Sequence, residues 1–135
     1  MREGEQPMNS DRKVAVFVSY ARSDMDYARR LSQFLRDNNI EVLDDQSVPV
    51  GDNFADTLRD EIGRAKSVVV LMSPDYFESR WCQVELAAAI AQEKQILPVR
   101  LRGEAEGPLA FLVHMHGEAG PEPVANKIAD IVAAP

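Results

Sequence analysis

Apolar and polar positions alternate in two distinct ways along this chain from residue 13 onward. Continuous apolar runs rich in β-branched residues predict four β-strands, at 14–18, 40–43, 67–72 and 96–101. Apolar residues spaced by three and four positions predict amphipathic helices, at about 27–37, 53–63, 81–94 and 123–132. Strands that alternate with helices in this way are typical of βα units built on a parallel sheet.

This order of elements predicts an α/β fold: a flavodoxin-like three-layer sandwich with a central parallel sheet of four to five strands and helices on both faces. Residues 109–115 fit either a short fifth strand or a helical turn. Ligands in such folds bind where the strands end, which here means residues 19–23, 44–52, 73–77 and 100–103.

Three local signals refine the boundaries of these elements. Ser23 and Asp26 have the spacing of a capping box at the start of the first helix. The segment Ser73-Pro74-Asp75 has the composition of a turn after the third strand. Pro98 lacks an N–H group, so we expect the fourth strand to lie at a sheet edge or to carry a bulge.

Size and composition are those of one globular domain. The chain has 135 residues, of which 45% are hydrophobic. Residues 1–12 are polar and are expected to be a disordered arm or a cloning remnant, which leaves 13–135 for the domain. No apolar run approaches the roughly 20 residues that cross a bilayer, and the acidic first residues lack the pattern of a secretory signal. We therefore expect a cytoplasmic domain with no membrane partner.

Negative charge is concentrated in one segment. The net charge is −7, and residues 41–62 carry seven acidic side chains against one basic side chain, Arg59. Nucleic-acid binding relies on clustered lysine and arginine, so no nucleic-acid partner is expected. The segment is interpreted either as the solvated face of a loop and helix or as an acidic docking patch.

Motifs of several enzyme classes are absent from the sequence. No Gly-x-Gly-x-x-Gly follows the first strand, and there is no phosphate-binding Walker loop or Gly-x-Ser-x-Gly elbow. His114 and His116 lie two apart with Glu118 beyond them, but without clear further ligands no metal site is expected. The single cysteine, Cys82, cannot form an internal disulfide and is expected to pack rather than react.

A phosphoacceptor receiver domain has the same order of elements. Its chemistry needs acidic residues directly after the first strand and an acceptor aspartate after the third. In this sequence the first strand ends in Ser19-Tyr20 and the third in Ser73-Pro74, with no aspartate at either position. The receiver interpretation therefore fails.

Trp81 and Glu85 are four residues apart on a predicted helix, so they share one face of it. A carboxylate beside an indole ring, near the ends of the strands, can hold a ribose between a flat surface and an acceptor for its hydroxyls. In the alternative interpretation Trp81 belongs to the core and Glu85 is a solvated helix acid. The spacing leaves both interpretations open.

Three segments in this order resemble the TIR domain, the Toll/interleukin-1 receptor/resistance family. The resemblance covers about residues 13–133. It consists of a first-strand signature, a loop after the second strand known in the family as the BB loop, and a third box of the bacterial and plant type. These segments read Phe17-Val18-Ser19-Tyr20-Ala21-Arg22-Ser23-Asp24, then 44–52 with its Gly51-Asp52 end, then Ser73-Pro74-Asp75-Tyr76-Phe77 with Ser79-Arg80-Trp81-Cys82 and Glu85-Leu86.

The resemblance implies an NAD⁺ glycohydrolase. Catalytic members carry an essential glutamate four residues after a tryptophan, which Glu85 and Trp81 match. The implied reaction cleaves the nicotinamide–ribose bond and gives nicotinamide plus ADP-ribose or a cyclic ADP-ribose, with NAD⁺ as substrate and no prosthetic group. An ionised Glu85 would stabilise the oxocarbenium-like ribose. The residues expected to bind substrate are Ser19, Tyr20, Arg22, Asp45, Phe54 and Trp81.

The family also includes scaffold members that signal only by binding other TIR domains. In them the BB loop supplies the contact surface, which here means Val48, Pro49, Val50, Gly51 and Asp52. The two interpretations are compatible, because catalytic members act as assemblies whose pocket a neighbouring BB loop completes. The resemblance thus implies self-association with other TIR domains, and the bacterial type of the third box implies an innate-immune or antiphage defence role.

Overall fold

The structure is a computed structural model that describes residues 13–44 and 54–133, with only the backbone of Phe54. The predicted arm at 1–12 and most of the BB loop, 45–53, lie outside the described residues. Within the described part no helix is both long and apolar enough to cross a membrane.

Five parallel strands form the middle layer, in the order β3-β2-β4-β5-β6. Their bounds are β2 Val14–Ser19, β3 Ile40–Leu43, β4 Ser67–Met72, β5 Gln95–Arg100 and β6 Met115–His116. The four predicted strands are confirmed, and all six residues of the central strand β4 are buried because both of its faces are covered. This is the predicted flavodoxin-like α/β fold.

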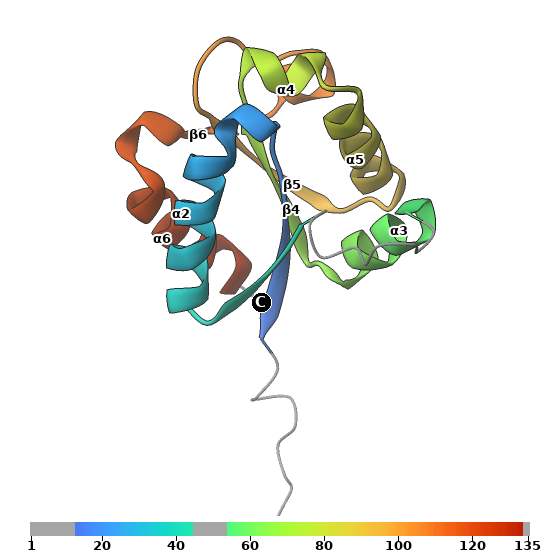
Figure 1. The fold of residues 1–135 in the computed structure, drawn as a ribbon. Coiled ribbons are helices and arrows are strands. Elements are labelled where there is room, and N and C mark those ends of the chain that lie inside the picture. Colours follow the sequence, from blue (N-terminus) through green and yellow to red (C-terminus); the bar gives the residue numbers. More distant parts are fainter. Residues whose placement is uncertain (1–12, 45–53, 134–135) are drawn as a thin grey trace, which may run out of the picture.

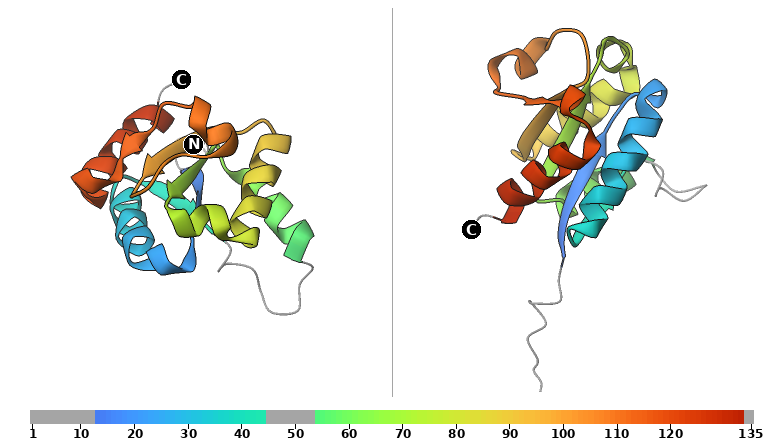
Figure 2. Two further views of the ribbon diagram at one scale, coloured as in Figure 1. Left: turned by 90° about the horizontal axis from the view of Figure 1, so that it is seen from above. Right: turned by 90° about the vertical axis from the view of Figure 1, so that its left-hand side faces the viewer.

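Helices cover the sheet on both faces, as predicted (Figure 1). The α-helices are α2 Met25–Asp37, α3 Phe54–Arg64, α4 Pro74–Glu78, α5 Arg80–Ala91 and α6 Pro121–Ala133, and three short 3₁₀ helices are η1 Arg22–Asp24, η3 Gly107–Phe111 and η4 Gly117–Ala119. Figure 2, seen from above, separates α2 and α6 on one side of the sheet from α3 and α5 on the other.

The alternation of side chains along β2 divides the core between these two layers. Ala15 and Phe17 belong to the cluster under α3 and α5, whereas Val16 and Val18 belong to the cluster under α2 and α6. Phe17, Val16 and Val18 are almost fully buried. This packing fixes the position of the end of β2, and with it the place of its last residue, Ser19.

Two local predictions are wrong. Ser23 does not form a capping box with Asp26: α2 begins after Asp24, and the Ser23 hydroxyl donates instead to Asp75 Oδ2 at 2.6 Å. Residues 73–75 are not an isolated turn but the start of α4, because the Ser73 side chain accepts a hydrogen bond from the N–H of Tyr76 and Pro74 occupies the first turn.

The fourth predicted strand is not an edge strand. β5 lies between β4 and β6, and Pro98 is paired with Val70 of β4. The proline is tolerated because β6 is only two residues long and pairs with Val99 and Arg100, one step past Pro98. The alternatives at 109–115 are both realised in part, since η3 forms a helical turn and β6 then forms the short fifth strand.

Candidate active site

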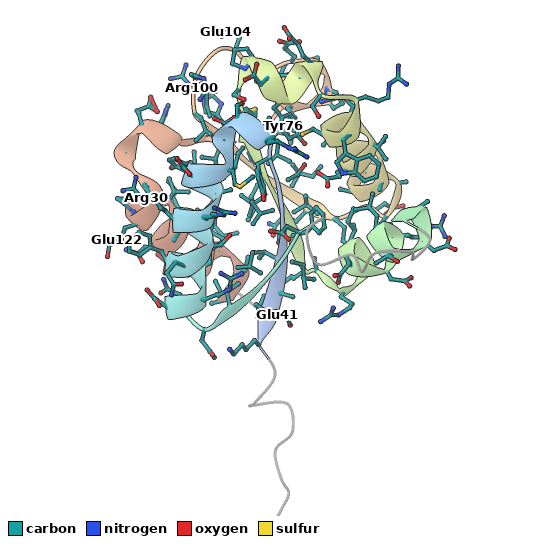
Figure 3. All side chains as sticks on the ribbon, in the orientation of Figure 1. Arg30, Glu41, Tyr76, Arg100, Glu104 and Glu122 are labelled. Atoms are coloured by element: carbon teal, nitrogen blue, oxygen red, sulfur yellow. The ribbon has the colours of Figure 1, made fainter. Side chains whose placement is uncertain are left out.

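Three buried side chains meet where the strands end. The Ser19 hydroxyl, at the end of β2, donates a hydrogen bond of 2.7 Å to Oε1 of Glu85 on α5 and lies 3.0 Å from the hydroxyl of Tyr76 on α4. Figure 3 labels Tyr76 at this end of the sheet, below α4. Ser19 and Tyr76 are 0% exposed and Glu85 is 2% exposed. The arrangement joins one strand and two helices through a single hydroxyl.

Two capped helix starts set the position of Glu85. Ser73 caps α4, and Ser79 caps α5 by accepting from the N–H of Cys82 at 3.1 Å. The side-chain amide of Gln83 donates to the carbonyl of Tyr76 at 2.9 Å and ties the two helices together. Glu85 then falls in the second turn of α5, on the side that faces Ser19.

A second buried network supports α4. One carboxylate oxygen of Asp24 accepts from the Ser73 hydroxyl at 2.7 Å, and the other accepts from the Arg102 guanidinium at 2.8 Å. The Asp24 side chain is 4% exposed, whereas that of Arg102 is 52% exposed. Segments after β2, β4 and β5 are therefore held together next to the Ser19 cluster.

Burial of the two polar groups has electrostatic consequences. A carboxylate that is almost fully enclosed costs free energy unless donors surround it, so buried acids are concentrated at functional sites. Burial also raises the pKa of Tyr76 well above its usual value, against a smaller opposing effect of the hydrogen bond with Ser19. Tyr76 is therefore a neutral phenol at physiological pH. Because Glu85 is only 2% exposed, its interpretation as a solvated helix acid is wrong.

Trp81 lies one turn before Glu85 on α5. Its half-buried ring packs against the core cluster under α3 and α5. It also lines an apolar groove of about 580 Å³ between these helices. Other groove residues are Ala55, Leu58, Arg59, Val84, Ala88, Ala91 and Gln92. The ring thus lies between the core and an open groove, while Glu85 points into the sheet.

The other expected substrate-binding residues lie elsewhere or cannot be placed. Tyr20 packs against the cluster under α2 and α6 and lines a polar groove of about 530 Å³ beside α2 and β3, on the layer opposite Glu85. Arg22 is exposed in η1. Asp45 and the BB-loop residues Val48, Pro49, Val50, Gly51 and Asp52 lie outside the described residues, as does the side chain of Phe54.

Tyr76 and Asp24 both support the site, although no sequence pattern indicated a role for either residue. Ser73-Pro74 carries the signal of a helix start, a capping residue followed by a proline, and that signal would have placed Tyr76 in the first turn of a helix. The pairing of Asp24 with Arg102 joins residues 78 positions apart and leaves no local signal.

No metal-ligand cluster forms among residues 13–44 and 54–133: no group of three or more His, Cys, Asp or Glu side chains is placed to hold an ion. The rings of His114 and His116 lie edge to face at 5.3 Å between centroids, and His116 Nδ1 is 3.8 Å from Glu118. Cys82 is buried outside any disulfide in the core cluster, where it packs as predicted.

Two relatives share part of their sequence with this chain. NAD(+) hydrolase TcpA of Theionarchaea archaeon (strain DG-70-1) is 29% identical over 98 residues, which are 68% of this chain and 30% of that protein. The 2' cyclic ADP-D-ribose synthase BtTIR of Bacteroides thetaiotaomicron is 32% identical over 89 residues, which are 62% of this chain and 31% of that protein. The matched region spans about a third of these curated relatives.

The fold is similar to that of a solved receptor domain. The TIR domain of the Toll-related receptor TRR-2 from Hydra magnipapillata superposes with a TM-score of 0.71 and 27% sequence identity, over 87% of this chain and 97% of that one. The family profile described as "TIR domain" matches residues 16–125, which include the Ser19, Tyr76 and Glu85 cluster. This chain belongs to the TIR-domain family.

Proposed function

We propose that this domain is an NAD⁺ glycohydrolase that cleaves the bond between nicotinamide and ribose. The observation that carries the proposal is the buried Glu85 carboxylate, which accepts a hydrogen bond from Ser19 at the end of β2, one turn after Trp81. Two relatives with about 30% identity are named for NAD⁺ hydrolysis and for synthesis of a cyclic ADP-ribose, which supports the same substrate.

The reaction suits a site with one carboxylate. Nicotinamide leaves NAD⁺ as a neutral molecule with the electron pair of the broken bond, so no general acid is needed. Positive charge then develops on the ribose, and an ionised carboxylate in a poorly solvated site stabilises it strongly. Water adds to the anomeric carbon and loses a proton to give ADP-ribose, whereas addition of a hydroxyl of the same molecule gives a cyclic product.

Each residue has a distinct role in this proposal. Glu85 is the catalytic residue, which accepts hydrogen bonds from the ribose hydroxyls and stabilises the developing charge. Ser19 holds the carboxylate in place with its 2.7 Å hydrogen bond. Trp81 supplies a flat apolar surface at the edge of the groove between α3 and α5. Tyr20, Arg22, Asp45 and Phe54 are proposed to contact the rest of the dinucleotide.

Self-association is part of the proposal. Because Glu85 is only 2% exposed, a ribose reaches its carboxylate only after neighbouring groups have moved. Binding of a second TIR domain through BB-loop residues 48–52 would supply the free energy for that change. We propose that the domain acts in this way in the cytoplasm, as the NAD⁺-cleaving part of an innate-immune or antiphage response.

A second candidate function is a non-catalytic scaffold that signals through TIR–TIR contacts alone. The enclosure of Glu85 is also compatible with this role, because a buried and hydrogen-bonded carboxylate can be structural. The two functions differ in whether NAD⁺ is consumed when the domains are clustered.

The discriminating experiment follows NAD⁺ and its products by chromatography, with the protein concentrated or clustered on beads. Glycohydrolase activity predicts that NAD⁺ is lost with the parent protein and not with Glu85→Ala. If neither protein consumes NAD⁺ under clustered conditions, the scaffold function is correct for this domain. The chromatogram also identifies linear or cyclic ADP-ribose.

A further inference from the structure

We propose that Tyr76 is a positioning residue for the proposed reaction: its hydroxyl fixes the direction of the Ser19 hydroxyl hydrogen, so that this hydrogen points at Glu85. The inference rests on the proposed function for its effect on turnover. The hydrogen-bond arrangement itself follows from the contacts of three side chains and is testable without turnover.

The number of hydrogens on the two hydroxyls limits how Ser19 and Tyr76 can bond. A serine hydroxyl has one hydrogen to donate and lone pairs to accept with, and a neutral phenol has the same inventory. The Ser19 hydrogen is directed to Oε1 of Glu85 at 2.7 Å. The 3.0 Å contact between Ser19 and Tyr76 can then be satisfied only if Tyr76 donates and Ser19 accepts.

The competing acceptor for the Tyr76 hydrogen is weaker. The carbonyl of Cys82 lies 3.5 Å from the Tyr76 hydroxyl, which is at the outer limit for a hydrogen bond between oxygens. If Tyr76 donated to that carbonyl, Ser19 would have to turn its hydrogen toward Tyr76, and the 2.7 Å hydrogen bond from Ser19 to Glu85 would be lost. The distances therefore favour a directed chain from Tyr76 to Ser19 to Glu85.

The surroundings of Tyr76 hold this direction. The side chain is completely buried, and its ring meets that of Phe77 edge to face at 5.5 Å between centroids. Burial raises the pKa of Tyr76, which keeps the hydrogen on the phenol. The helix that carries it is capped by Ser73, whose hydroxyl is itself held by the buried Asp24.

A fixed donor affects the reaction because chained hydrogen bonds strengthen one another in a poorly solvated site. When Tyr76 donates to Ser19, Ser19 becomes a better donor to the carboxylate and has one preferred orientation. The carboxylate is then oriented before the ribose acquires charge, and no reorganisation is needed during bond cleavage. Loss of the Tyr76 hydroxyl should lower kcat much more than it changes KM.

The test compares two tyrosines of this chain. Tyr76→Phe removes the donor to Ser19, and Tyr27→Phe removes a donor of similar kind, which bonds the carbonyl of Gly117 at 2.8 Å in the opposite layer. We expect Tyr76→Phe to lower kcat for NAD⁺ cleavage by about tenfold or more with KM within about twofold, and Tyr27→Phe to leave both unchanged. An unchanged kcat in Tyr76→Phe, or an equal loss in both variants, would overturn the inference.

A thermal measurement keeps the inference testable if the parent protein cleaves no NAD⁺. Tyr76→Phe is compared in the parent and in the Glu85→Gln background. In the Glu85→Gln background the side-chain amide at position 85 can donate a hydrogen bond to Ser19. Ser19 can then direct its own hydrogen toward residue 76, so Ser19 no longer needs Tyr76 as a donor. We expect the loss of melting temperature caused by Tyr76→Phe to be at least about halved in that background. An equal loss of melting temperature in both backgrounds contradicts the directed chain from Tyr76 to Ser19 to Glu85. If the parent cleaves no NAD⁺ but the loss is halved, only the proposed function is contradicted.

Discussion

Ser19 and Glu85 are 66 residues apart in the sequence, yet the hydroxyl of one lies 2.7 Å from a carboxylate oxygen of the other. Their contact connects the end of a central strand with the second turn of a helix on the α3–α5 face of the sheet. It also accounts for a buried glutamate in a helix that is rich in alanine. The carboxylate is buried with a hydrogen-bond donor beside it, so its orientation is fixed.

The first prediction concerns the buried Asp24. Asp24→Ala removes the acceptor of both Ser73 and Arg102, so we expect the free energy of unfolding to fall by about 2–3 kcal/mol. Urea denaturation measures this loss. Arg59→Ala is the control, because the Arg59–Asp56 pair is exposed on both sides and should contribute less than about 0.5 kcal/mol. Similar losses in the two variants would show that Asp24 does not support the site.

The second prediction contrasts two glycines. A Cβ at Gly117 would lie 2.9 Å from the carbonyl oxygen of Arg100, so Gly117→Ala must displace backbone and should lower the free energy of unfolding by about 1–3 kcal/mol. A Cβ at Gly63, within α3, would meet only the side chain of Gln92 at an ordinary 3.4 Å. Gly63→Ala should raise the free energy by about 0.5 kcal/mol because alanine favours the helix. Thermal unfolding that orders the two variants the other way would refute the packing described.

The third prediction concerns alkaline pH. Burial, with a smaller contribution from Glu118, raises the pKa of Tyr27 from its ordinary value of 10.0 to about 12 in the folded protein. The unfolded chain therefore releases this proton first as pH rises. The contribution of this raised pKa to the free energy of unfolding is fully present below pH 10 and is lost between pH 10 and about 12.

Unfolding midpoints across that range measure the loss. The unfolding midpoint of Tyr27→Phe should fall less steeply with pH than that of the parent. The part of the pH dependence that comes from Tyr76 should remain, because burial raises the pKa of Tyr76 in the same direction. A parent whose stability does not change between neutral pH and pH 12 would contradict the burial of these phenols.

The fourth prediction uses Trp81, the only tryptophan of the chain, as a reporter. If its half-exposed ring supplies a wall of the substrate site, NAD⁺ should change its fluorescence in the non-cleaving variant Glu85→Gln. Titration of that variant measures the change, and Trp81→Phe should bind NAD⁺ about tenfold more weakly in calorimetry. Binding detected by calorimetry without any change in fluorescence would remove Trp81 from the site.

Much of the fold follows from local patterns in the sequence. The run Val68-Val69-Val70 predicts a buried strand because a strand covered on both faces needs apolar residues at consecutive positions. The capping box at Ser23 fails because Ser23 lies inside η1 and α2 begins two residues later, while its hydroxyl donates to Asp75 from a distant part of the chain. Local spacing cannot predict such a contact.

The candidate site was predictable in part. The spacing of Trp81 and Glu85 puts both on one face of a helix, and the family resemblance identifies Glu85 as the candidate catalytic residue. The burial of Glu85 and its hydrogen bond from Ser19 both depend on where β2 ends relative to α5. Packing across the whole α3–α5 layer sets that position, so local sequence patterns do not predict it. The proposed roles of Tyr20 and Arg22 rest on their position in the loop after β2. The layer on which Tyr20 packs could not be predicted from that position, because successive side chains at the end of a strand point to opposite faces.

The central claim is that Glu85 acts as an ionised carboxylate in cleavage of the nicotinamide–ribose bond. The most direct test measures release of nicotinamide from NAD⁺ by clustered parent protein and by clustered Glu85→Gln, which keeps the shape of the side chain and removes its charge. We predict one nicotinamide for each NAD⁺ consumed by the parent and a loss of at least about 100-fold in the variant, with both proteins folded. Equal release by the two proteins would contradict the claim.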